Sequence, residues 1–365
     1  MGLSGVKPPM VARLPGTPYM EFQENYDNKL HIRRYFDMKK LISVFIIILL
    51  ILSISSAMAF AAKKRQIAGP KKTQSYEISE PEQTPPVSQE ETKQPSQTAI
   101  SSNNTGFGTW LWNPWLIVSS KDEILNYLRI NGYSELYLQI DSTLDLRYYR
   151  DFVSSATSYG INVYALSGDS IWIWQDKREG FYNFIRWVEN YNLSVSENEK
   201  FCGIHFDVEP YQNAEWNTAR DNVILNYQNF VDEAVLQAAR LNLPVVFDIP
   251  FWFDEIYYSN KYGSGNLAQW IISKTSWTNI MAYRDSSQEI IAIAENEAGY
   301  AKNFGKRLVI SVETQPSSEG ENVTFFEEGL ATMYSELSNV KAYFDSKGYT
   351  NIGFAVHHLA SVMKM

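Results

Sequence analysis

From Gly106 onward, short apolar runs alternate with longer amphipathic stretches, and this alternation limits the possible folds more than any other feature of the sequence. The runs recur about every 25 to 45 residues, a spacing typical of the β-α units that build a parallel sheet. Eight runs have the character of strands: 109–113, 135–141, 161–167, 201–209, 243–250, 278–285, 307–313 and 351–358. Stretches between them are predicted to form helices: 120–133, 146–160, 214–241, 288–305 and 326–349.

Eight β-α units within about 260 residues are the usual content of a (β/α)8 barrel, or TIM barrel. Several predicted helices end in a glycine just before the next strand, which is a common helix C-terminal signal. These glycines are Gly132, Gly160, Gly305 and Gly348. An open, doubly wound sheet is the alternative, but it seldom needs eight successive units, and no glycine-rich phosphate loop follows the first strand. We therefore predict an α/β fold, with a (β/α)8 barrel over residues 106–365.

The residues before the barrel divide into three segments of different composition. Residues 1–37 have no periodic pattern and form an N-terminal extension. Residues 38–62 contain an uncharged apolar run, Leu41 to Ala62, which is long enough to cross a bilayer. Residues 63–105 are rich in Pro, Gln, Ser, Thr and Glu and have almost no aromatics, so we expect a disordered linker.

The apolar run has two interpretations, a cleaved signal peptide or a membrane anchor. If translation starts at Met38, two lysines, the apolar run and the small residues near Ala59 have the layout of a signal peptide. If the preceding residues are translated, the run becomes an anchor, whose orientation the basic residues on both sides do not decide. In either case we expect the barrel to be secreted or held at the extracellular face, with membrane contact only through this N-terminal segment.

Charge and cysteine content exclude several classes of protein. The net charge is −9, and the barrel has no Lys/Arg cluster with interleaved aromatics, which argues against a nucleic-acid partner. The single cysteine, Cys202, excludes an intramolecular disulfide and a Cys-based zinc site. Because the sequence also lacks an H-E-x-x-H string, we expect no metal and no cofactor.

Polar residues gather on one face of the predicted fourth strand. In a (β/α)8 barrel the active site lies at the C-terminal ends of the strands, and alternate residues face the interior. His205, Asp207 and Glu209 share the inward face, while the apolar residues from Cys202 to Val208 face the helices. The same rule applied to all strands predicts a ring of polar residues at one mouth: Asp141, Asp207, Glu209, Asp248, Tyr283, Glu313 and His357.

Within this ring, Asp207 and Glu209 are two residues apart, roughly 6 to 7 Å along a strand. Like-charged carboxylates so close raise the proton affinity of one of them, as a general acid at neutral pH requires. Polar strand ends also serve as helix caps or as a salt-bridged rim, which is the alternative for each residue taken singly.

Aromatic residues fall at the strand ends or in the loops that follow them: Trp110, Trp112, Trp115, Trp172, Trp174, Tyr211, Trp216, Trp252 and Phe253. Some belong to the core. The others, for which we single out Trp112, Tyr211 and Trp252, would present rings suited to stacking on the apolar faces of sugars. A phosphate-binding barrel would instead show glycine-rich loops and basic residues at this end.

The fourth strand, GIHFDVEP, resembles the catalytic strand of family 18 glycoside hydrolases, the chitinase group, whose pattern is D-G-x-D-x-D-x-E. The resemblance implies that Glu209 is the general acid and that Asp207 orients the acetamido group of the substrate. Met281-Ala282-Tyr283 is similar to the M-x-Y-D string of the same family, whose Tyr also contacts that group. Cys202, His205 and Arg284 stand where the family has Asp, which departs from the acetamido-assisted pattern.

A second resemblance is to the large clan of retaining glycosidases, which carry an acid/base Glu after strand four and a nucleophilic Glu after strand seven. Glu209-Pro210 and Glu313 fit this arrangement, although Val208 replaces the usual Asn. The chain as a whole is similar to bacterial glycoside-hydrolase-like barrels outside both groups.

We therefore expect an extracellular hydrolase of a cell-wall or exopolysaccharide glycan, with a polysaccharide or oligosaccharide as its partner. Glu209 would be the proton donor, with either Glu313 as nucleophile or Asp207 assisting a substrate-assisted route, while Tyr283, Asp248 and His357 orient the sugar or the acid. One alternative is a carbohydrate-binding barrel without catalysis. Another is a metal-dependent amide or ester hydrolase that uses His205, His357 and nearby carboxylates.

Overall fold

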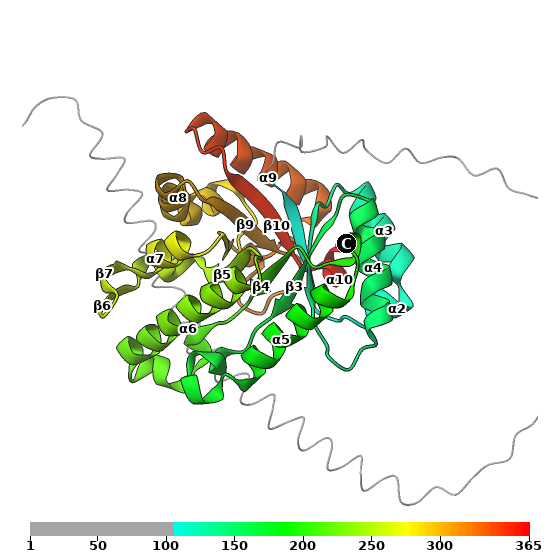
Figure 1. The fold of residues 1–365 in the computed structure, drawn as a ribbon. Helices are drawn as coiled ribbons and strands as arrows, with labels where there is room; N and C mark the ends of the chain where they lie inside the picture. The colour runs from blue at the N-terminus through cyan, green and yellow to red at the C-terminus, as the bar shows by residue number, and fades with distance from the viewer. Residues whose placement is uncertain (1–105) are drawn as a thin grey trace, which may run out of the picture. The chain divides into compact units, whose positions relative to one another are not determined.

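The computed structural model describes residues 106–365, which form a closed barrel of eight parallel strands surrounded by helices (Figure 1). The barrel strands are β1 (Phe107–Leu111), β2 (Glu135–Gln139), β3 (Asn162–Ser167), β4 (Gly203–Phe206), β5 (Val245–Pro250), β8 (Trp277–Met281), β9 (Arg307–Glu313) and β10 (Ile352–His357). β1 pairs in parallel with both β2 and β10, and this pairing closes the sheet. The predicted (β/α)8 barrel is confirmed, and the open-sheet alternative is wrong.

The predictions for the N-terminal segments lie outside the described residues. They concern the extension 1–37, the signal peptide or anchor 38–62 and the linker 63–105. Among residues 106–365, no helix is long and apolar enough to cross a membrane.

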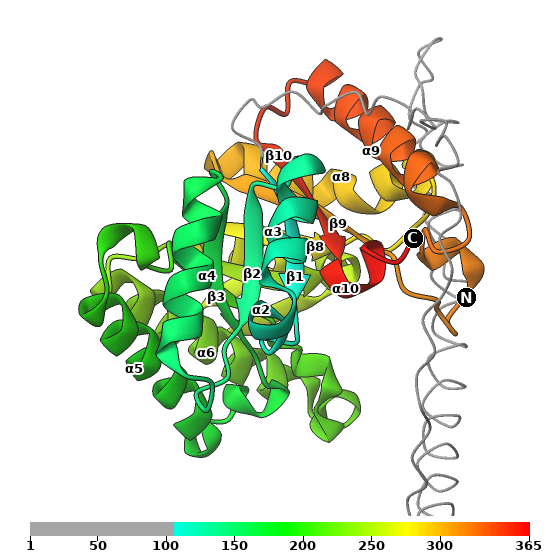
Figure 2. The same ribbon diagram turned by 90° about the vertical axis from the view of Figure 1, so that its right-hand side faces the viewer.

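The helices are α2 (Leu116–Ser119), α3 (Lys121–Ile130), α4 (Leu146–Ser158), α5 (Glu179–Ser194), α6 (Arg220–Arg240), α7 (Leu267–Lys274), α8 (Ser287–Phe304), α9 (Gly329–Ser346) and α10 (Leu359–Val362). α3 and α4 lie side by side outside β1 and β2 (Figure 2). The helix predicted over 214–241 is in fact a 3-10 turn, η5 (Ala214–Asn217), followed by α6. A small antiparallel hairpin, β6 (Tyr257–Asn260) and β7 (Gly263–Asn266), was not predicted.

The glycine signals at the ends of the helices are confirmed by backbone geometry. Gly305 closes α8 in the left-handed conformation with φ of 63°, and its N–H donates to the carbonyls of Ala301 and Lys302. Gly132, Gly160 and Gly348 also have positive φ, between 73° and 75°. A side chain with a Cβ disfavours this conformation, so glycine fixes where these helices stop.

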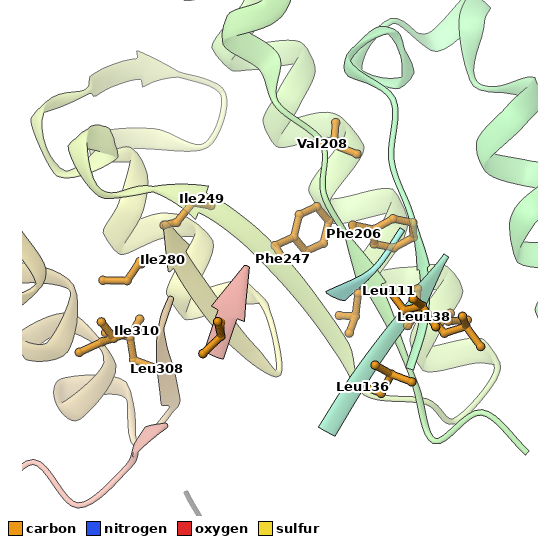
Figure 3. Close-up of a cluster of buried hydrophobic side chains, with 14 of the residues drawn as sticks. Leu111, Leu136, Leu138, Phe206, Val208, Phe247, Ile249, Ile280, Leu308 and Ile310 are labelled. Atoms are coloured by element: carbon orange, nitrogen blue, oxygen red, sulfur yellow. The ribbon is translucent and has the colours of Figure 1, made fainter. Parts of the chain in front are cut away.

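Apolar residues on the outer faces of the strands form a continuous layer beneath the helices. Figure 3 shows part of this layer on neighbouring strands, including Phe206 of β4 and Phe247 of β5, whose ring centroids are 5.3 Å apart. Val208, just beyond β4, is buried in the same layer. The outward-facing apolar set that the alternation rule predicted for the fourth strand is therefore confirmed from Ile204 to Val208.

A second apolar cluster fills the inside of the barrel and consists of Trp110, Tyr137, Tyr164, Leu166, Val309 and Ala355. The ring of Tyr137 lies 4.9 Å from that of Trp110 and 5.8 Å from that of Tyr164. Cys202 was expected to face the helices but packs against this inner cluster. The expectation fails because β4 begins only at Gly203, so the alternation of the strand does not extend to Cys202.

An ion pair lies across the barrel at the N-terminal ends of the strands, below the inner cluster. Arg307, the first residue of β9, binds Glu135, the first residue of β2, with N–O distances of 2.5 and 2.9 Å. The hydroxyl of Tyr137 donates to Glu135 at 3.1 Å, and the guanidinium lies 5.1 Å from the centroid of Trp277. Both charged side chains are largely buried, at 6% and 17% exposure.

We predict that Glu135→Ala lowers the free energy of unfolding by about 3 to 5 kcal/mol, because the buried guanidinium loses its carboxylate. Urea unfolding followed by tryptophan fluorescence measures this loss. Replacing both partners, with Glu135→Leu and Arg307→Met, should recover part of it, since no unpaired charge remains. Glu197→Ala, which removes an exposed pair with Lys200, is the control and should cost about 1 kcal/mol or less. A loss of that size for Glu135→Ala would show that the cross-barrel pair does not stabilise the fold.

Candidate active site

Asp207 and Glu209 lie just beyond the end of β4, which stops at Phe206 and not at residue 209 as predicted. The chain nevertheless stays extended there, since the N–H of Asp207 donates to the carbonyl of Ser167 at 3.2 Å. With Val208 buried on the outer side, Asp207 and Glu209 fall on the inner side, and both line the same pocket. The structure therefore brings together the carboxyl pair that the sequence predicted.

Asp248 of β5 is buried inside the barrel between a tryptophan and a histidine. Its Oδ2 accepts from Trp110 Nε1 at 3.0 Å and lies 2.7 Å from His205 Nε2. Burial lowers the pKa of His205 to about 3, although the charge of Glu135 opposes the shift, so this imidazole is neutral at pH 7. The neutral histidine contributes a hydrogen bond to the acidic cluster but no positive charge.

Burial among like charges keeps protons on this cluster. The pKa of Asp207 is raised well above its ordinary value, first by burial and then by the charges of Asp248 and Glu209. Burial also raises the pKa of Asp248, against the effect of the Trp110 hydrogen bond. Among the described residues, no donor reaches the buried Oδ1 of either Asp207 or Asp248.

Glu209 is held by the turn that follows it, η4 (Pro210–Gln212). The hydroxyl of Tyr211 donates to its Oε1, and the amide of Gln212 donates to its Oε2. Burial raises the pKa of Glu209 in spite of these two hydrogen bonds, which favour the anion. A carboxyl with a raised pKa in a partly open pocket is suited to donate a proton near neutral pH.

Glu313 and His357 form a second unit from the ends of β9 and β10, where the two residues are directly paired in the sheet register. His357 Nδ1 lies 2.8 Å from Glu313 Oε2, and Trp112 Nε1 donates to His357 Nε2 at 2.9 Å. An indole N–H only donates, so Nε2 accepts and the ring proton sits on Nδ1, facing Glu313. The other oxygen of Glu313 accepts from the backbone N–H groups of Thr314 and Gln315, at 2.7 and 2.8 Å.

Two opposing influences act on the proton of His357. Burial disfavours the imidazolium, but the hydrogen bond and charge of Glu313 outweigh it, so the pKa of His357 is raised. A proton added at Nε2 would displace the N–H of Trp112, which therefore opposes the rise. The imidazole is consequently held in one orientation by contacts at both nitrogens.

Three further predicted residues surround these two units. The ring of Tyr283 lies 5.9 Å from that of His357, and burial raises its pKa well above the ordinary value. Tyr211 packs edge-on against Trp252, with ring centroids 5.1 Å apart. Trp252 in turn contacts Trp216, so this pair belongs to an aromatic cluster beside the site.

Asp141 was predicted to belong to the polar ring, but its contacts lie elsewhere. β2 ends at Gln139, and the carboxylate of Asp141 accepts from the backbone and hydroxyl of Thr143 and from Trp115. The hydrogen bonds from Thr143 lower the pKa of Asp141, the opposite of what happens at Asp207. This carboxylate stabilises the loop after β2 and is partly exposed.

A pocket of about 300 Å³ opens at this end of the barrel, and its lining residues are Trp112, Gly168, Asp169, Ser170, Asp207, Glu209 and Gln212. Sequence reasoning missed the three residues of the loop after β3 and Gln212. The string Ser167-Gly168-Asp169-Ser170 directly follows a predicted strand, so the rule of polar strand ends could have found it. A Cβ at Gly168 would lie 1.7 Å from the carbonyl oxygen of Asp207, so only glycine fits where this loop meets β4.

Residues that could hold a metal ion do not gather at this site. Within residues 106–365 no group of three or more His, Cys, Asp or Glu side chains is arranged to bind one. His205 and His357, which the metal-hydrolase alternative would use, each bond to a different carboxylate, Asp248 and Glu313.

No protein-family model matches the chain, and no curated protein matches it. Several solved chitinase structures are similar to it at low identity. A family 18 chitinase from Cycas revoluta in complex with (GlcNAc)3 is 11% identical, with a TM-score of 0.41 over 71% of this chain and 96% of that one. A chitinase from Chromobacterium violaceum is 10% identical, with a TM-score of 0.37 over 57% and 68% of the two chains. The second catalytic domain of a group II chitinase from Ostrinia furnacalis is 14% identical, with a TM-score of 0.37 over 61% and 69%.

The raised pKa of Asp207 has a consequence for stability that depends on pH. The folded chain keeps this proton at pH values where the unfolded chain has lost it, so the free energy of unfolding falls as pH rises above about 4. We predict that Asp207→Asn stabilises the fold at pH 7, by on the order of 1 kcal/mol. The gain should disappear near pH 4, where both states are protonated, and urea unfolding at the two pH values measures it.

Asp141→Asn is the control for this prediction, because the pKa of Asp141 is lowered. Its carboxylate therefore adds to the free energy of unfolding at pH 7, whereas that of Asp207 subtracts from it. That substitution should destabilise the fold slightly at pH 7 and have less effect near pH 4. If Asp207→Asn also destabilised the protein at pH 7, the pKa of Asp207 would not be raised by its burial and its acidic neighbours.

Proposed function

We propose that the barrel hydrolyses a glycosidic bond, with Glu209 as the general acid. The observation that carries this proposal is the shared pocket of Asp207 and Glu209, in which burial raises the pKa of both carboxyls beside the ring of Trp112. A protonated Glu209 would give its proton to the glycosidic oxygen as the bond to the anomeric carbon breaks. Trp112 would supply the apolar surface on which a sugar ring packs.

Asp207 would hold the group that attacks the anomeric carbon. Its buried Oδ1 has no donor among residues 106–365, so an O–H or N–H of the substrate or of a water can bind there. Glu313 is less suited to attack directly, because both of its oxygens accept hydrogen bonds and it is not among the residues that line the pocket. In this proposal Glu313 orients His357, and His357 in turn orients Trp112 through their hydrogen bond.

The substrate would be an extracellular glycan, of a cell wall or an exopolysaccharide. This part of the proposal is supported by the apolar run from Leu41 to Ala62 and by the Pro-rich composition of residues 63–105, which are typical of an exported and tethered domain. The alternative of a binding barrel without catalysis predicts glycan binding with no release of reducing ends.

We predict that Glu209→Gln lowers the release of reducing sugar from cell-wall glycans and exopolysaccharides about 10²- to 10⁴-fold, because the leaving oxygen loses its proton donor. Aryl glycosides with nitrophenol leaving groups should lose much less, since such groups depart without protonation. Glu313→Gln should have a smaller effect than Glu209→Gln on the natural glycans.

Glu197→Gln, at an exposed carboxylate of η3 (Glu197–Glu199), is the control and should leave the rate unchanged. Equal and complete loss in the Glu313 and Glu209 variants would instead support a covalent route with Glu313 as nucleophile. Glycan binding by the wild type without any release of reducing ends would support the binding-only alternative.

We predict that protease added to intact bacterial cells that produce the chain digests the barrel, or that the barrel is recovered from the medium. Deletion of residues 41–62 should retain the barrel inside the cell, because the segment that directs export is missing. Protection of the full chain from external protease, together with its absence from the medium, would contradict an extracellular location.

A further inference from the structure

Among the described residues, those that line the pocket at the mouth of the barrel include three acidic side chains and no basic one. Asp207 and Glu209 follow β4, and Asp169 follows β3 on the neighbouring wall. The uncharged lining residues are Trp112, Gly168, Ser170 and Gln212. A ligand that enters this pocket therefore meets carboxyl groups on two adjacent strand ends, and the carboxyl of Asp169 is the exposed one.

The basic residues of the loop after β3 do not line the pocket, and His357, whose raised pKa favours the imidazolium, is paired with Glu313. Arg178 is buried, and its guanidinium donates to the carbonyls of Trp172 and Ile173 at 2.9 and 3.0 Å. Lys177 lies in the 3-10 turn η2 (Gln175–Lys177) and is not among the lining residues. His205, the imidazole nearest to Asp248, is neutral at pH 7 as described above.

Asp169 differs from the other two carboxylates in being exposed at the rim. One of its oxygens, Oδ1, accepts from the N–H of Ile171 at 3.1 Å and caps the turn η1 (Ser170–Ile173). This cap leaves Oδ2 for a ligand. Deeper in the pocket, the buried Oδ1 of Asp207 has no donor within the described part of the chain.

The barrel as a whole is acidic in composition, as the lining of the pocket is. Residues 106–365 contain 19 Lys and Arg against 32 Asp and Glu. A cleft lined by one sign of charge raises the local concentration of ligands of the opposite sign and repels ligands of its own sign. A uronic acid or a sulfated sugar would have to place its anion beside carboxyl groups, and no Lys or Arg of residues 106–365 lines the pocket to compensate it.

We infer that the pocket selects a cationic glycan, a polymer of amino sugars of which at least some carry a free ammonium group, and that Asp169 is a residue that determines this specificity. The inference deepens the proposed function and rests on it for the glycan nature of the ligand. A substrate ammonium would pair with Asp169 and would favour the ionised forms of the two carboxyls deeper in the pocket, while a neutral N-acetylated sugar would gain nothing from Asp169.

The test compares three oligosaccharides at pH 6 and low salt, where the amino groups of glucosamine are protonated. They are a glucosamine hexamer, the N-acetylglucosamine hexamer of the same linkage, and a galacturonic acid hexamer. Binding to the full chain is measured by isothermal titration calorimetry. We expect the glucosamine hexamer to bind on the order of ten-fold more tightly than the N-acetylated one, and the galacturonic acid hexamer not to bind.

Asp169→Asn removes the charge and keeps the cap, because Asn also accepts from the N–H of Ile171. This substitution should lower the ratio of the affinity for the glucosamine hexamer to the affinity for the N-acetylglucosamine hexamer about two- to five-fold. Asp176→Asn, in the exposed turn η2 outside the pocket, removes the same charge and should leave the ratio unchanged. An equal fall in the ratio for both variants would show a general charge effect and overturn the role of Asp169.

Equal affinities of the wild type for the two amino-sugar hexamers, tighter binding of the galacturonic acid hexamer, or no binding of the glucosamine hexamer would each overturn the inference. Release of reducing ends is followed separately in the same samples. Preferred binding of the glucosamine hexamer without cleavage would sustain the inference and contradict the proposed hydrolysis. If the two amino-sugar hexamers bound with equal affinity and both were cleaved, the result would support the proposed hydrolysis and contradict the inference of a cationic preference.

Discussion

Closure of the sheet is the constraint on which the rest of this structure depends. Because β1 pairs with both β2 and β10, the inner faces of eight strands share one narrow space that has to be filled without water. The inner aromatic cluster around Tyr137 fills the middle, and the pair of Glu135 and Arg307 lies below it. The remaining polar space lies at the C-terminal ends of the strands, which is why Asp248, Asp207 and Glu209 are crowded together there.

This crowding sets the chemistry of the upper end. The three carboxyl groups lie close together, and the nearby His205 is neutral. The imidazole of His357 makes its hydrogen bonds to Glu313 and Trp112. Such an arrangement disfavours full ionisation and so costs stability at neutral pH. It also keeps protons available at a pocket that is open to a ligand, and the absence of Lys and Arg from the described lining of that pocket is the basis of the preference for cationic ligands that we infer.

The spacing of the apolar runs and the alternation of apolar and polar residues predicted most of the fold. These patterns, like the glycines that end helices, are local signals in the sequence. The inward positions of His205, Asp207 and Glu209 followed from the alternation of the fourth strand alone. The true start of that strand did not, so Cys202 was placed on the wrong face. Asp141 was also predicted from alternation, but β2 stops at Gln139, and the carboxylate of Asp141 bonds to Thr143 and Trp115 in the structure.

What the sequence could not predict are contacts between residues far apart in the chain. The bond from Trp112 to His357 spans 245 positions, and nothing local to either residue indicates it. The approach of Gly168 to the backbone of Asp207 is of the same kind, and it has a practical use. Any chain that builds this pocket in the same way has to keep glycine there and a carboxyl pair after the next strand. The strings SGDS and HFDVEP, about 35 residues apart, together form a fingerprint with which relatives could be sought when overall identity is too low to detect them.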